Sequence, residues 1–390
     1  MEISVGLRGS NLTQDSAGFR LQVAQPLLIP SPSEGLRIES RYATCACIDI
    51  VAFSGQNPLR QTFLVREKLN MKAIVVHEFG APEVMKLEEF PTPKAGPGQA
   101  VVRIHAAGVN PFDTYMRAGT YAIKPQLPYV PGGEGAGVVH SVGEGITQFK
   151  AGDRVYVGHP VTGTYAEYCL ALESQLHHLP ERTTFPQGAG IYVACGTAYH
   201  GLYHHANARA SETLLVHGAS GGVGIAAVQI ARAMGMTVIG TAGTEKGLEL
   251  VRREGAHHAF NHRNAGYTDA ILKATNGRGV DVVLEMLANV NLAADLKLLA
   301  RFGRVIVIGS RGDISITPRD LMGRTSSVRG FVLWGISEAD EADVHAGLYA
   351  GLENGTVRPV VGKELPLGEA VRAHKEIMET GALGKTILIP

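Results

Sequence analysis

The sequence predicts an α/β fold in which a doubly wound parallel sheet follows a domain of short, irregular strands. From about residue 191 onward, short apolar runs alternate with amphipathic runs, as in parallel sheets covered by helices on both faces. Residues 71–190 are instead rich in β-branched residues punctuated by glycine and proline, which is typical of strands joined by turns. The third observation is the apolar run Leu214–Val216, which leads into a glycine cluster at residues 218–224. That junction predicts a strand, a tight turn and the start of a helix.

The composition is that of a soluble globular protein. The chain has 390 residues, of which 45% are hydrophobic and 18% charged, so two domains are expected because a single core rarely grows this large. A formal net charge of zero excludes a global basic field that would attract nucleic acid or anionic lipid, although a local basic patch stays open. No apolar run approaches the roughly 18 residues of a membrane helix, so we expect no membrane partner.

Residues 1–70 differ in texture from the rest of the chain. They mix Ser, Pro, Gly and Arg without sustained periodicity, and a clear strand opens only at Met71, as at a natural N-terminus. Three interpretations compete: an artefact of an upstream start, a disordered tail, or an organelle-targeting peptide. Targeting peptides are poor in acidic residues, whereas Glu2, Asp15 and Glu34 are spread through this segment. We favour an artefact or a disordered tail, and a cytoplasmic location over a mitochondrial one.

The four cysteines form no recognisable framework. Cys45, Cys47, Cys169 and Cys195 are too scattered for a disulfide scaffold or a four-thiolate zinc site, so a reducing compartment fits best. Cys195 has no base beside it in the sequence, which favours an inert buried thiol over a nucleophile.

The elements can be placed in order along the chain. In the first segment, residues 71–190, the clearest strands are Gln99–His105 and Gly135–Val142. The second segment, residues 191–330, continues after the glycine cluster with strands at 237–241, 258–261, 280–285 and 304–309 and with helices near 245–254, 267–275 and 292–299. The tail, residues 331–390, is expected to hold helices at 341–354 and 369–380 and a strand at 385–389. We infer that the tail returns to the first domain, which makes residues 191–330 an insertion.

The glycine cluster carries the pattern Ala219-x-Gly221-x-x-Gly224. A strand, a glycine turn and a helix start can hold a dinucleotide pyrophosphate on free backbone N–H groups. Gly221 would let the backbone approach the phosphates, and Gly224 would let the helix pack close to the strand. Tight helix–strand packing without any ligand is the alternative, because such a motif alone is a weak signal.

The end of the second strand of this unit indicates which dinucleotide would bind. Sites for NAD place a carboxylate there, whereas sites for NADP omit that charge because it would repel the 2′-phosphate. Residues 240–244 contain no acid, and Glu245 is expected to begin the next helix. Lys246, His262 and Arg263 could supply positive charge, although Lys246 could equally be a solvated helix residue and His262 a plain loop residue. The pattern favours NADPH.

A run of ordered motifs over residues 71–390 resembles the zinc-independent medium-chain dehydrogenase/reductase family, and within it the zeta-crystallin-like NADPH:quinone oxidoreductases. The motifs are residues 110–115, 117–121, 127–132, 150–155, 163–168, 216–224, 285–292 and 308–312. The resemblance implies a GroES-like irregular β-barrel catalytic domain, a Rossmann domain and a cleft between them, in a homo-oligomer, expected to be a tetramer. It also implies reduction of ortho- and para-quinones by NADPH through one-electron steps that give semiquinones.

The resemblance carries site residues over position by position. Asn110, Tyr115 and Tyr121 would line the quinone pocket as the candidate catalytic residues. The cofactor contacts would be Tyr115, Ser220, Gly221, Gly222, Val223, Gly243, His262, Asn291, Ile308, Gly309, Ser310, Arg311, Phe331, Val332 and Leu333, joined by Lys246 on the charge argument above.

The sequence predicts no metal centre. Where zinc enzymes of the superfamily have a ligand Cys segment and a Gly-His-Glu, this chain has Gly108-Val109-Asn110 and Gly132-Gly133-Glu134, and Glu134 cannot hold zinc alone. The adjacent pairs His177-His178 and His204-His205 are unsuited to a chelate of i, i+4 spacing, so we interpret them as surface or core residues.

Chemistry without a metal favours an acceptor that takes electrons readily, such as a quinone. Tyr115 and Tyr121 offer ring faces for a planar acceptor and hydroxyls for its oxygens, because a phenol stays protonated at neutral pH. Either tyrosine could instead be packed core, and Asn110 could be a turn residue before Pro111. The family resemblance also permits two alternatives: an NADPH-dependent reductase of enoyl or other activated C=C bonds, and a non-catalytic protein that binds AU-rich RNA or serves as a structural crystallin.

Overall fold

The computed structural model describes residues 2–4, 50–52, 62–65 and 70–390. The chain divides into two compact units, Met1–Leu69 and Asn70–Pro390. In the first unit, three short strands form an antiparallel sheet in the order β1-β3-β2: β1 (Glu2–Ser4), β2 (Ile50–Ala52) and β3 (Thr62–Val65). The predictions for the remainder of residues 1–70, including Cys45 and Cys47, lie outside the described residues.

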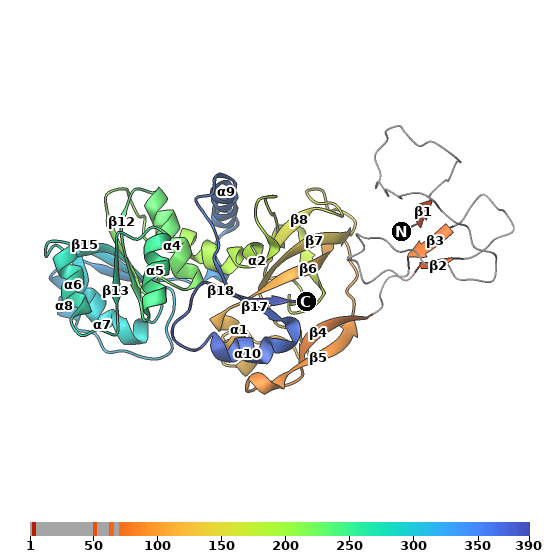
Figure 1. The fold of residues 1–390 in the computed structure, drawn as a ribbon, viewed down its shortest axis with the longest axis horizontal. Coiled ribbons are helices and arrows are strands. Elements are labelled where there is room, and N and C mark those ends of the chain that lie inside the picture. Colours follow the sequence, from red (N-terminus) through yellow and green to blue (C-terminus); the bar gives the residue numbers. More distant parts are fainter. Residues whose placement is uncertain (1, 5–49, 53–61, 66–69) are drawn as a thin grey trace. The chain divides into compact units, whose positions relative to one another are not determined.

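A six-stranded parallel sheet lies at one end of the second unit (Figure 1), in the order β13-β12-β11-β14-β15-β16. Its strands are β11 (Thr213–Val216), β12 (Thr237–Ala242), β13 (His258–Asn261), β14 (Val280–Glu285), β15 (Leu299–Val307) and β16 (Ser327–Gly330). The strand order reverses direction at β11, which places a crevice outside the carboxyl ends of β11 and β14. In such sheets that crevice is the usual ligand site.

Helices cover both faces of this sheet because its strands are apolar on both sides. Leu214 and Val216 belong to one buried cluster, which includes residues of α4 and α5, whereas Leu215 belongs to another, which includes residues of α6 and α7. The helices are α4 (Gly222–Ala233), α5 (Glu245–Arg253), α6 (Tyr267–Ala274), α7 (Ala288–Leu298) and α8 (Pro318–Met322). The predicted doubly wound parallel sheet is confirmed.

A second, mixed sheet has the strand order β10-β8-β7-β6-β18-β17, with β9 also paired to β6. Its strands are β6 (Gln99–Val109), β7 (Glu134–Val142), β8 (Arg154–Gly158), β9 (Tyr168–Leu172), β10 (Leu176–His178), β17 (Val361–Pro366) and β18 (Lys385–Ile389), next to the hairpin of β4 (Asn70–Val76) and β5 (Met85–Pro91). β18 lies antiparallel to β6, and β17 lies parallel to β18. The end of the chain therefore completes a sheet whose first strand along the chain, β6, begins at Gln99.

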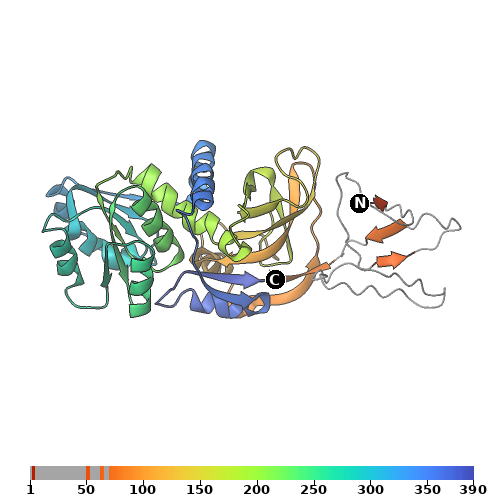
Figure 2. The same ribbon diagram turned by 45° about the horizontal axis from the view of Figure 1, so that its top comes forward.

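Helical segments connect and cover the two sheets. They are η1 (Pro82–Val84), α1 (Pro111–Ala118), η2 (Glu173–Gln175), α2 (Phe185–Gly188), η3 (Ile191–Cys195), α3 (Gly196–His200), η4 (Gly201–His205), η5 (Leu333–Gly335), α9 (Glu338–Asn354), η6 (Leu367–Glu369) and α10 (Ala370–Glu376). η3 and η4 are π-helical and flank α3. α9 stands between the two sheets in both Figure 1 and Figure 2. Within the described residues, no helix is both long and apolar enough to span a lipid bilayer.

The predicted starts of one helix and one strand were wrong. α7 begins at Ala288 rather than near residue 292, and β15 begins at Leu299 rather than at residue 304. Leu299 pairs with Val280, and the register then shifts before Arg304 pairs with Val282. Arg301 and Gly303 hide the first part of this strand, because they break the apolar run from which a strand is predicted.

Candidate functional site

The glycine turn between β11 and α4 is an open helix N-terminus. α4 begins at Gly222 with Gly221 as its N-cap, which supplies no side-chain hydrogen bond to the first turn. The first N–H groups of a helix have no partner within it, so they are free for an anion. A Cβ added at Gly224 would lie 2.5 Å from Ala219 Cα, whereas one at Gly221 would meet nothing closer than 3.5 Å. The predicted packing role of Gly224 is confirmed, and the turn fits a pyrophosphate.

The predicted cofactor residues of the parallel sheet gather along its carboxyl edge. Parallel strands end at the same edge, so the residues that follow successive strands become neighbours. Ser220, Gly221, Gly222 and Val223 follow β11, Gly243 follows β12, His262 follows β13, Ile308, Gly309, Ser310 and Arg311 follow β15, and Phe331, Val332 and Leu333 follow β16. Asn291 lies in the first turns of α7, and Lys246 is exposed in the first turn of α5.

The charge at the end of β12 is positive. A Cβ added at Gly243 would lie 2.9 Å from His262 Nε2 and 3.0 Å from Arg263 Nε, so both side chains lie over this strand end. Arg263 Nη2 donates to Thr380 Oγ1 at 2.8 Å. Glu245 is the first residue of α5, as predicted. The strand end itself carries no acid, as the sequence shows.

A segment near the C-terminus, residues 378–384, crosses this edge, which sequence reasoning missed. Gly384 N donates to Ser220 O at 2.7 Å, and Arg311 Nη1 donates to Met378 O at 3.3 Å. Gly384 has a φ of 77°, in the left-handed region that favours glycine. The glycines of this segment, Gly381 and Gly384, are the only local signal that could have pointed to a close backbone approach.

A buried polar network joins the ends of β6, β7 and β18 within the mixed sheet. Lys385 Nζ donates to Asn110 Oδ1 and to Glu134 Oε1, each at 2.5 Å, and Asn110 Nδ2 donates to Glu134 Oε1 at 2.9 Å. Glu134 Oε2 accepts from Val193 N at 2.8 Å. The three residues are at most 6% exposed. Asn110 and Glu134, which occupy the places of zinc-ligand segments in the resemblance, are thus bound to a lysine.

The network extends to α1. Asp113 Oδ2 accepts from Asn110 N at 2.9 Å and lies 3.4 Å from Tyr165 Oη. Burial raises the pKa of Asp113 to about 7, although the Asn110 N–H and the nearby Lys385 favour its charged form. Tyr115 is half-buried on the same helix.

An aromatic cavity of about 430 Å³ lies where α1, β8 and the segment before α9 meet. Trp334 Nε1 donates to Tyr121 Oη at 2.5 Å, and the Trp334 ring meets Phe112 edge-on with centroids 4.7 Å apart. The lining comprises Met116, Tyr121, Ile123, Gly158, His159, Ser174, Gln175, Tyr192, Leu333, Trp334, Ile336 and Glu341. It therefore joins a predicted quinone residue, Tyr121, to a predicted cofactor residue, Leu333. Trp334 was missed, because a lone tryptophan in a segment without periodicity gives no signal of its partners.

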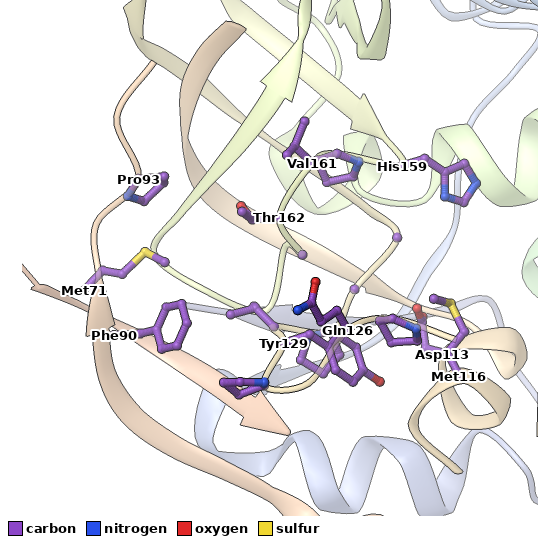
Figure 3. Close-up of a pocket in the computed structure, with 18 of the residues that line it drawn as sticks. Met71, Phe90, Pro93, Asp113, Met116, Gln126, Tyr129, His159, Val161 and Thr162 are labelled. Atoms are coloured by element: carbon purple, nitrogen blue, oxygen red, sulfur yellow. The ribbon is translucent and has the colours of Figure 1, made fainter. Parts of the chain in front are cut away.

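A neighbouring cavity of about 540 Å³ lies within the first domain (Figure 3). Met71, Phe90 and Tyr129 are among the residues that line it, and it shares Met116 and His159 with the aromatic cavity. None of the predicted cofactor residues lines it. The aromatic cavity is therefore the better candidate for an acceptor that must meet a nicotinamide.

Comparison with known proteins agrees with this geometry. The Alcohol dehydrogenase GroES-like domain model matches residues 96–181, and the Zinc-binding dehydrogenase model matches residues 222–346. The chain is 49% identical to the quinone oxidoreductase of Homo sapiens over 323 residues, which are 82% of this chain and 98% of the relative. The chain belongs to the medium-chain dehydrogenase/reductase family. Among solved structures of the fold, the Escherichia coli quinone oxidoreductase complexed with NADPH has a TM-score of 0.74 and 29% identity, covering 82% of this chain and 100% of that one. A mycobacterial protein complexed with NADPH has a TM-score of 0.76, 29% identity and the same coverage.

In this medium-chain dehydrogenase/reductase, the buried side chains of His217, Glu285 and Asp295 lie close together next to the carboxyl edge of the parallel sheet. We call these three residues the buried triad. Glu285 Oε1 accepts from Asn291 Nδ2 at 3.1 Å, and His217 Nε2 donates to Asp295 Oδ1 at 2.8 Å. Burial raises the pKa of Glu285 to about 7. Burial opposes protonation of His217, but its bond to Asp295 prevails and raises the His217 pKa. The triad holds the candidate cofactor residue Asn291 in place.

The two described cysteines of this medium-chain dehydrogenase/reductase are buried and inert. Burial raises the pKa of the Cys195 thiol to about 12 and also raises that of Cys169. A thiol is nucleophilic only as the thiolate. The prediction that the Cys195 thiol is buried is confirmed, and its raised pKa disfavours the thiolate.

Proposed function

We propose that this chain catalyses the NADPH-dependent reduction of quinones. The main observation that supports this reaction is the aromatic cavity. In it, Tyr121 and Trp334 lie beside Leu333, which follows a strand at the carboxyl edge of the parallel sheet. The quinone oxidoreductase names of relatives at about half identity support the same reaction, as do NADPH-complexed quinone oxidoreductases among the structural neighbours.

NADPH, when bound, supplies the reducing equivalents. The open N-terminus of α4 binds the pyrophosphate through backbone N–H groups, and Gly221 leaves room for it. Arg263 and His262 over Gly243, with Lys246 on α5, bind the 2′-phosphate through charge-assisted hydrogen bonds. The remaining predicted cofactor residues along the edge position the rest of the dinucleotide.

The chain's own side chains then hold and orient the acceptor. Tyr121 and Trp334 supply faces and edges for a flat ring, which packs best against other aromatic rings in an offset or edge-on arrangement. Tyr121 lines this cavity and donates a hydrogen bond to an oxygen of the acceptor. The other two predicted quinone residues, Tyr115 and Asn110, are absent from the cavity lining, and Asn110, fixed by Lys385 and Glu134, instead caps the N-terminus of α1. Trp334 is thus an additional lining residue of the proposed quinone pocket.

A steady-state assay tests the reaction class directly. Purified protein is expected to oxidise NADPH with ortho- and para-quinones, and to turn over enoyl thioesters slowly or not at all. Binding of NADPH without turnover of any quinone, together with rapid reduction of an enoyl thioester, would contradict the proposal. Electron spin resonance during turnover tests whether the electrons pass one at a time.

Arg263→Gln is expected to raise the KM for NADPH by about tenfold or more, because a charge-assisted hydrogen bond to a phosphate contributes about 1.5–3 kcal/mol. The KM for NADH is expected to change less than about twofold, since NADH carries no 2′-phosphate. Arg253→Gln, which removes the same charge at the far end of α5, is the matched control and should leave both values unchanged. Equal effects of Arg263→Gln on NADPH and NADH would refute this role.

Trp334→Ala is expected to raise the KM for a planar three-ring ortho-quinone by about tenfold, because the lost ring contacts cost roughly 1.4 kcal/mol. The KM for NADPH should change less than about twofold. Tyr349→Ala removes an exposed ring from α9, away from the cavity lining, and serves as the control. A KM for the quinone that stays at the parent value would remove Trp334 from the acceptor site.

The proposal also includes the predicted domain division, oligomeric state and RNA partner. Residues 71–190 and 331–390 form the catalytic domain, and residues 191–330 form the cofactor domain. The chain assembles as a homo-oligomer, with a tetramer expected by analytical ultracentrifugation. AU-rich RNA is a secondary partner, tested by competition with NADPH and by a steep salt dependence of binding.

A further inference from the structure

Five side chains form a cluster that the proposed reaction does not use. His200, His204 and His205 come from the helical turn that runs through α3 and η4, and Asp340 and Asp343 come from the start of α9. We call these five residues the histidine–aspartate cluster. None of the five lines the aromatic cavity.

Three of these residues bring ligand atoms together. One atom each from His200, His204 and Asp340 lies within 4.8 Å of the other two, and His204 Nδ1 lies 3.0 Å from Asp340 Oδ1. His200 and His204 are four residues apart, the spacing that places two imidazoles on one helical face. In the sequence, the adjacent pair His204-His205 hides this spacing. η4 is π-helical, a distortion that often occurs at functional sites.

The other two residues orient the histidines. His204 Nε2 lies 3.0 Å from Asp343 Oδ2, and His205 Nε2 lies 3.1 Å from His200 Nε2. A carboxylate or similar partner behind a histidine is the usual support of a metal ligand, because it fixes which nitrogen carries the proton. His204 therefore has one ring nitrogen beside Asp343 and the other beside Asp340, so its imidazole is oriented by two carboxylates from α9.

His200 provides an independent sign of a missing partner. The residue is 3% exposed, and its Nδ1 is buried without a hydrogen-bond partner. Buried polar atoms are nearly always paired, since leaving one unpaired costs free energy. The Nε2 atom already faces His205, so Nδ1 is the nitrogen left for a ligand.

We propose that the histidine–aspartate cluster binds one divalent transition-metal ion, Zn²⁺ by its chemistry, through His200, His204 and Asp340. Imidazole and carboxylate ligands suit zinc, whereas Mg²⁺ and Ca²⁺ prefer oxygen ligands alone. Asp343 and His205 hold the two histidines in position, and water completes the coordination shell.

The two other His and acid groups in the described part of the chain are less suitable. His177 and His345 stack with centroids 3.5 Å apart and planes 16° apart, whereas the rings of His200 and His204 stack less closely, with centroids 4.8 Å apart and planes 30° apart, which leaves more room for an ion. His345 Nδ1 also faces Tyr156 Oη at 2.7 Å. In the triad of His217, Glu285 and Asp295, both nitrogens of His217 already have partners.

The bound ion would stabilise the segment that precedes α9. Phe331 stacks on His205 with centroids 4.4 Å apart and planes 10° apart, and the following residues supply Leu333 and Trp334 to the aromatic cavity. A metal that ties Asp340 to His200 and His204 therefore pins residues 331–340 at both ends. Its role is structural, and it takes no part in the reduction of the acceptor.

Zinc titration of the metal-free full chain tests this site. The protein carries Cys45→Ser and Cys47→Ser, because free thiolates bind zinc themselves, and it is stripped with chelator before isothermal titration with Zn²⁺. We expect one equivalent to bind and to raise the Tm. Asp340→Asn and His204→Asn should weaken binding by more than about 100-fold, and Asp343→Asn by about tenfold, within the range typical of an outer partner.

Two control variants make the outcome decisive. Glu338→Gln removes the same charge from the first turn of α9, and His345→Asn disables the stacked histidine pair; both should leave the zinc Kd within about twofold of the parent. Asp340 is about 40% exposed, so its amide variant tests the site even if a variant at buried His200 fails to fold. The proposal is overturned if the parent binds no zinc at about 0.1 mM, if Asp340→Asn binds it like the parent, or if only His345→Asn loses it.

Discussion

Replacing Lys385 with methionine is expected to lower the free energy of unfolding by about 3–5 kcal/mol, because it leaves a buried carboxylate without its counter-ion. Lys385 is 6% exposed and donates to both Asn110 Oδ1 and Glu134 Oε1. Its stem also lies against the cofactor turn, since a Cβ at Gly222 would lie 3.4 Å from Lys385 Cδ. The variant is therefore expected to weaken NADPH binding as well. Urea unfolding and a fluorescence titration with NADPH measure the two effects.

A double variant separates the loss of the ion pair from the loss of packing. Lys385→Met with Glu134→Gln removes both charges, so it should unfold less readily than Lys385→Met alone, with a coupling free energy above about 1 kcal/mol. Lys375→Met breaks an exposed pair with Glu83 and should cost less than about 1 kcal/mol. Additive effects of Lys385→Met and Glu134→Gln would show that the buried network does not act as a unit.

Acid is expected to destabilise the protein below about pH 6.5. In this pH range, several buried histidines are neutral in the folded protein but become protonated when it unfolds. Burial lowers the pKa of His159 and His374 to about 3, that of His345 to about 4, and that of His177 well below its usual value. An unfolded histidine has a pKa near 6.5, so on unfolding each of the four takes up a proton below that pH. Their contribution to stability is present above pH 6.5 and is lost as the pH falls.

Two carboxyl groups oppose this trend over the same range. The pKa values of Asp113 and Glu285 are raised to about 7, so below pH 7 these groups hold protons when folded that they release on unfolding. The histidines take up more protons on unfolding than the two carboxyl groups release, and His200, whose pKa burial lowers to about 4, adds to this uptake. The free energy of unfolding is therefore expected to fall as the pH falls between roughly pH 6.5 and pH 4.5, by about 1.4 kcal/mol per pH unit for each proton of net uptake. Urea unfolding at several pH values measures it.

Two variants should change that slope in opposite directions. His374→Gln keeps a polar partner for Tyr165 Oη and removes one titrating group, so the slope should fall by about 1.4 kcal/mol per pH unit. Asp113→Asn removes an opposing carboxyl, so the slope should rise by a similar amount. Two results would contradict the burial of these groups: a free energy of unfolding that does not depend on pH in the parent protein, or a slope against pH that is the same in both variants as in the parent.

Much of the cofactor edge could be predicted from the sequence because its signals are local. The alternation of strands and helices identified the parallel sheet, and the residues after each strand meet at one edge by topology alone. Gly224 and Glu245 took their predicted places since a close helix approach and a helix start leave marks within a few residues. Boundaries were less certain where an interruption such as residues 301–303 hid a strand.

The residues that sequence reasoning missed depend on partners far along the chain. Trp334 meets Tyr121 across 213 positions, and Lys385 meets Asn110 across 275. No periodicity links such pairs, because their contact is made only when the last strand enters the first sheet beside β6. Burial likewise depends on neighbours from several elements, so the raised pKa of Asp113 has no signature in the sequence around it.

The sequence by itself determined the fold class, the family and the glycine turn, since these follow from local periodicity and from motifs whose spacing reflects backbone geometry. Only the tertiary structure decided how Asn110 is held, which rings wall the acceptor cavity, and that His200 and His204 face Asp340 from another helix. The physical reason is that hydrogen bonding, burial and charge depend on distances in space. Only the folding of the chain decides which side chains from distant parts of the sequence come close together.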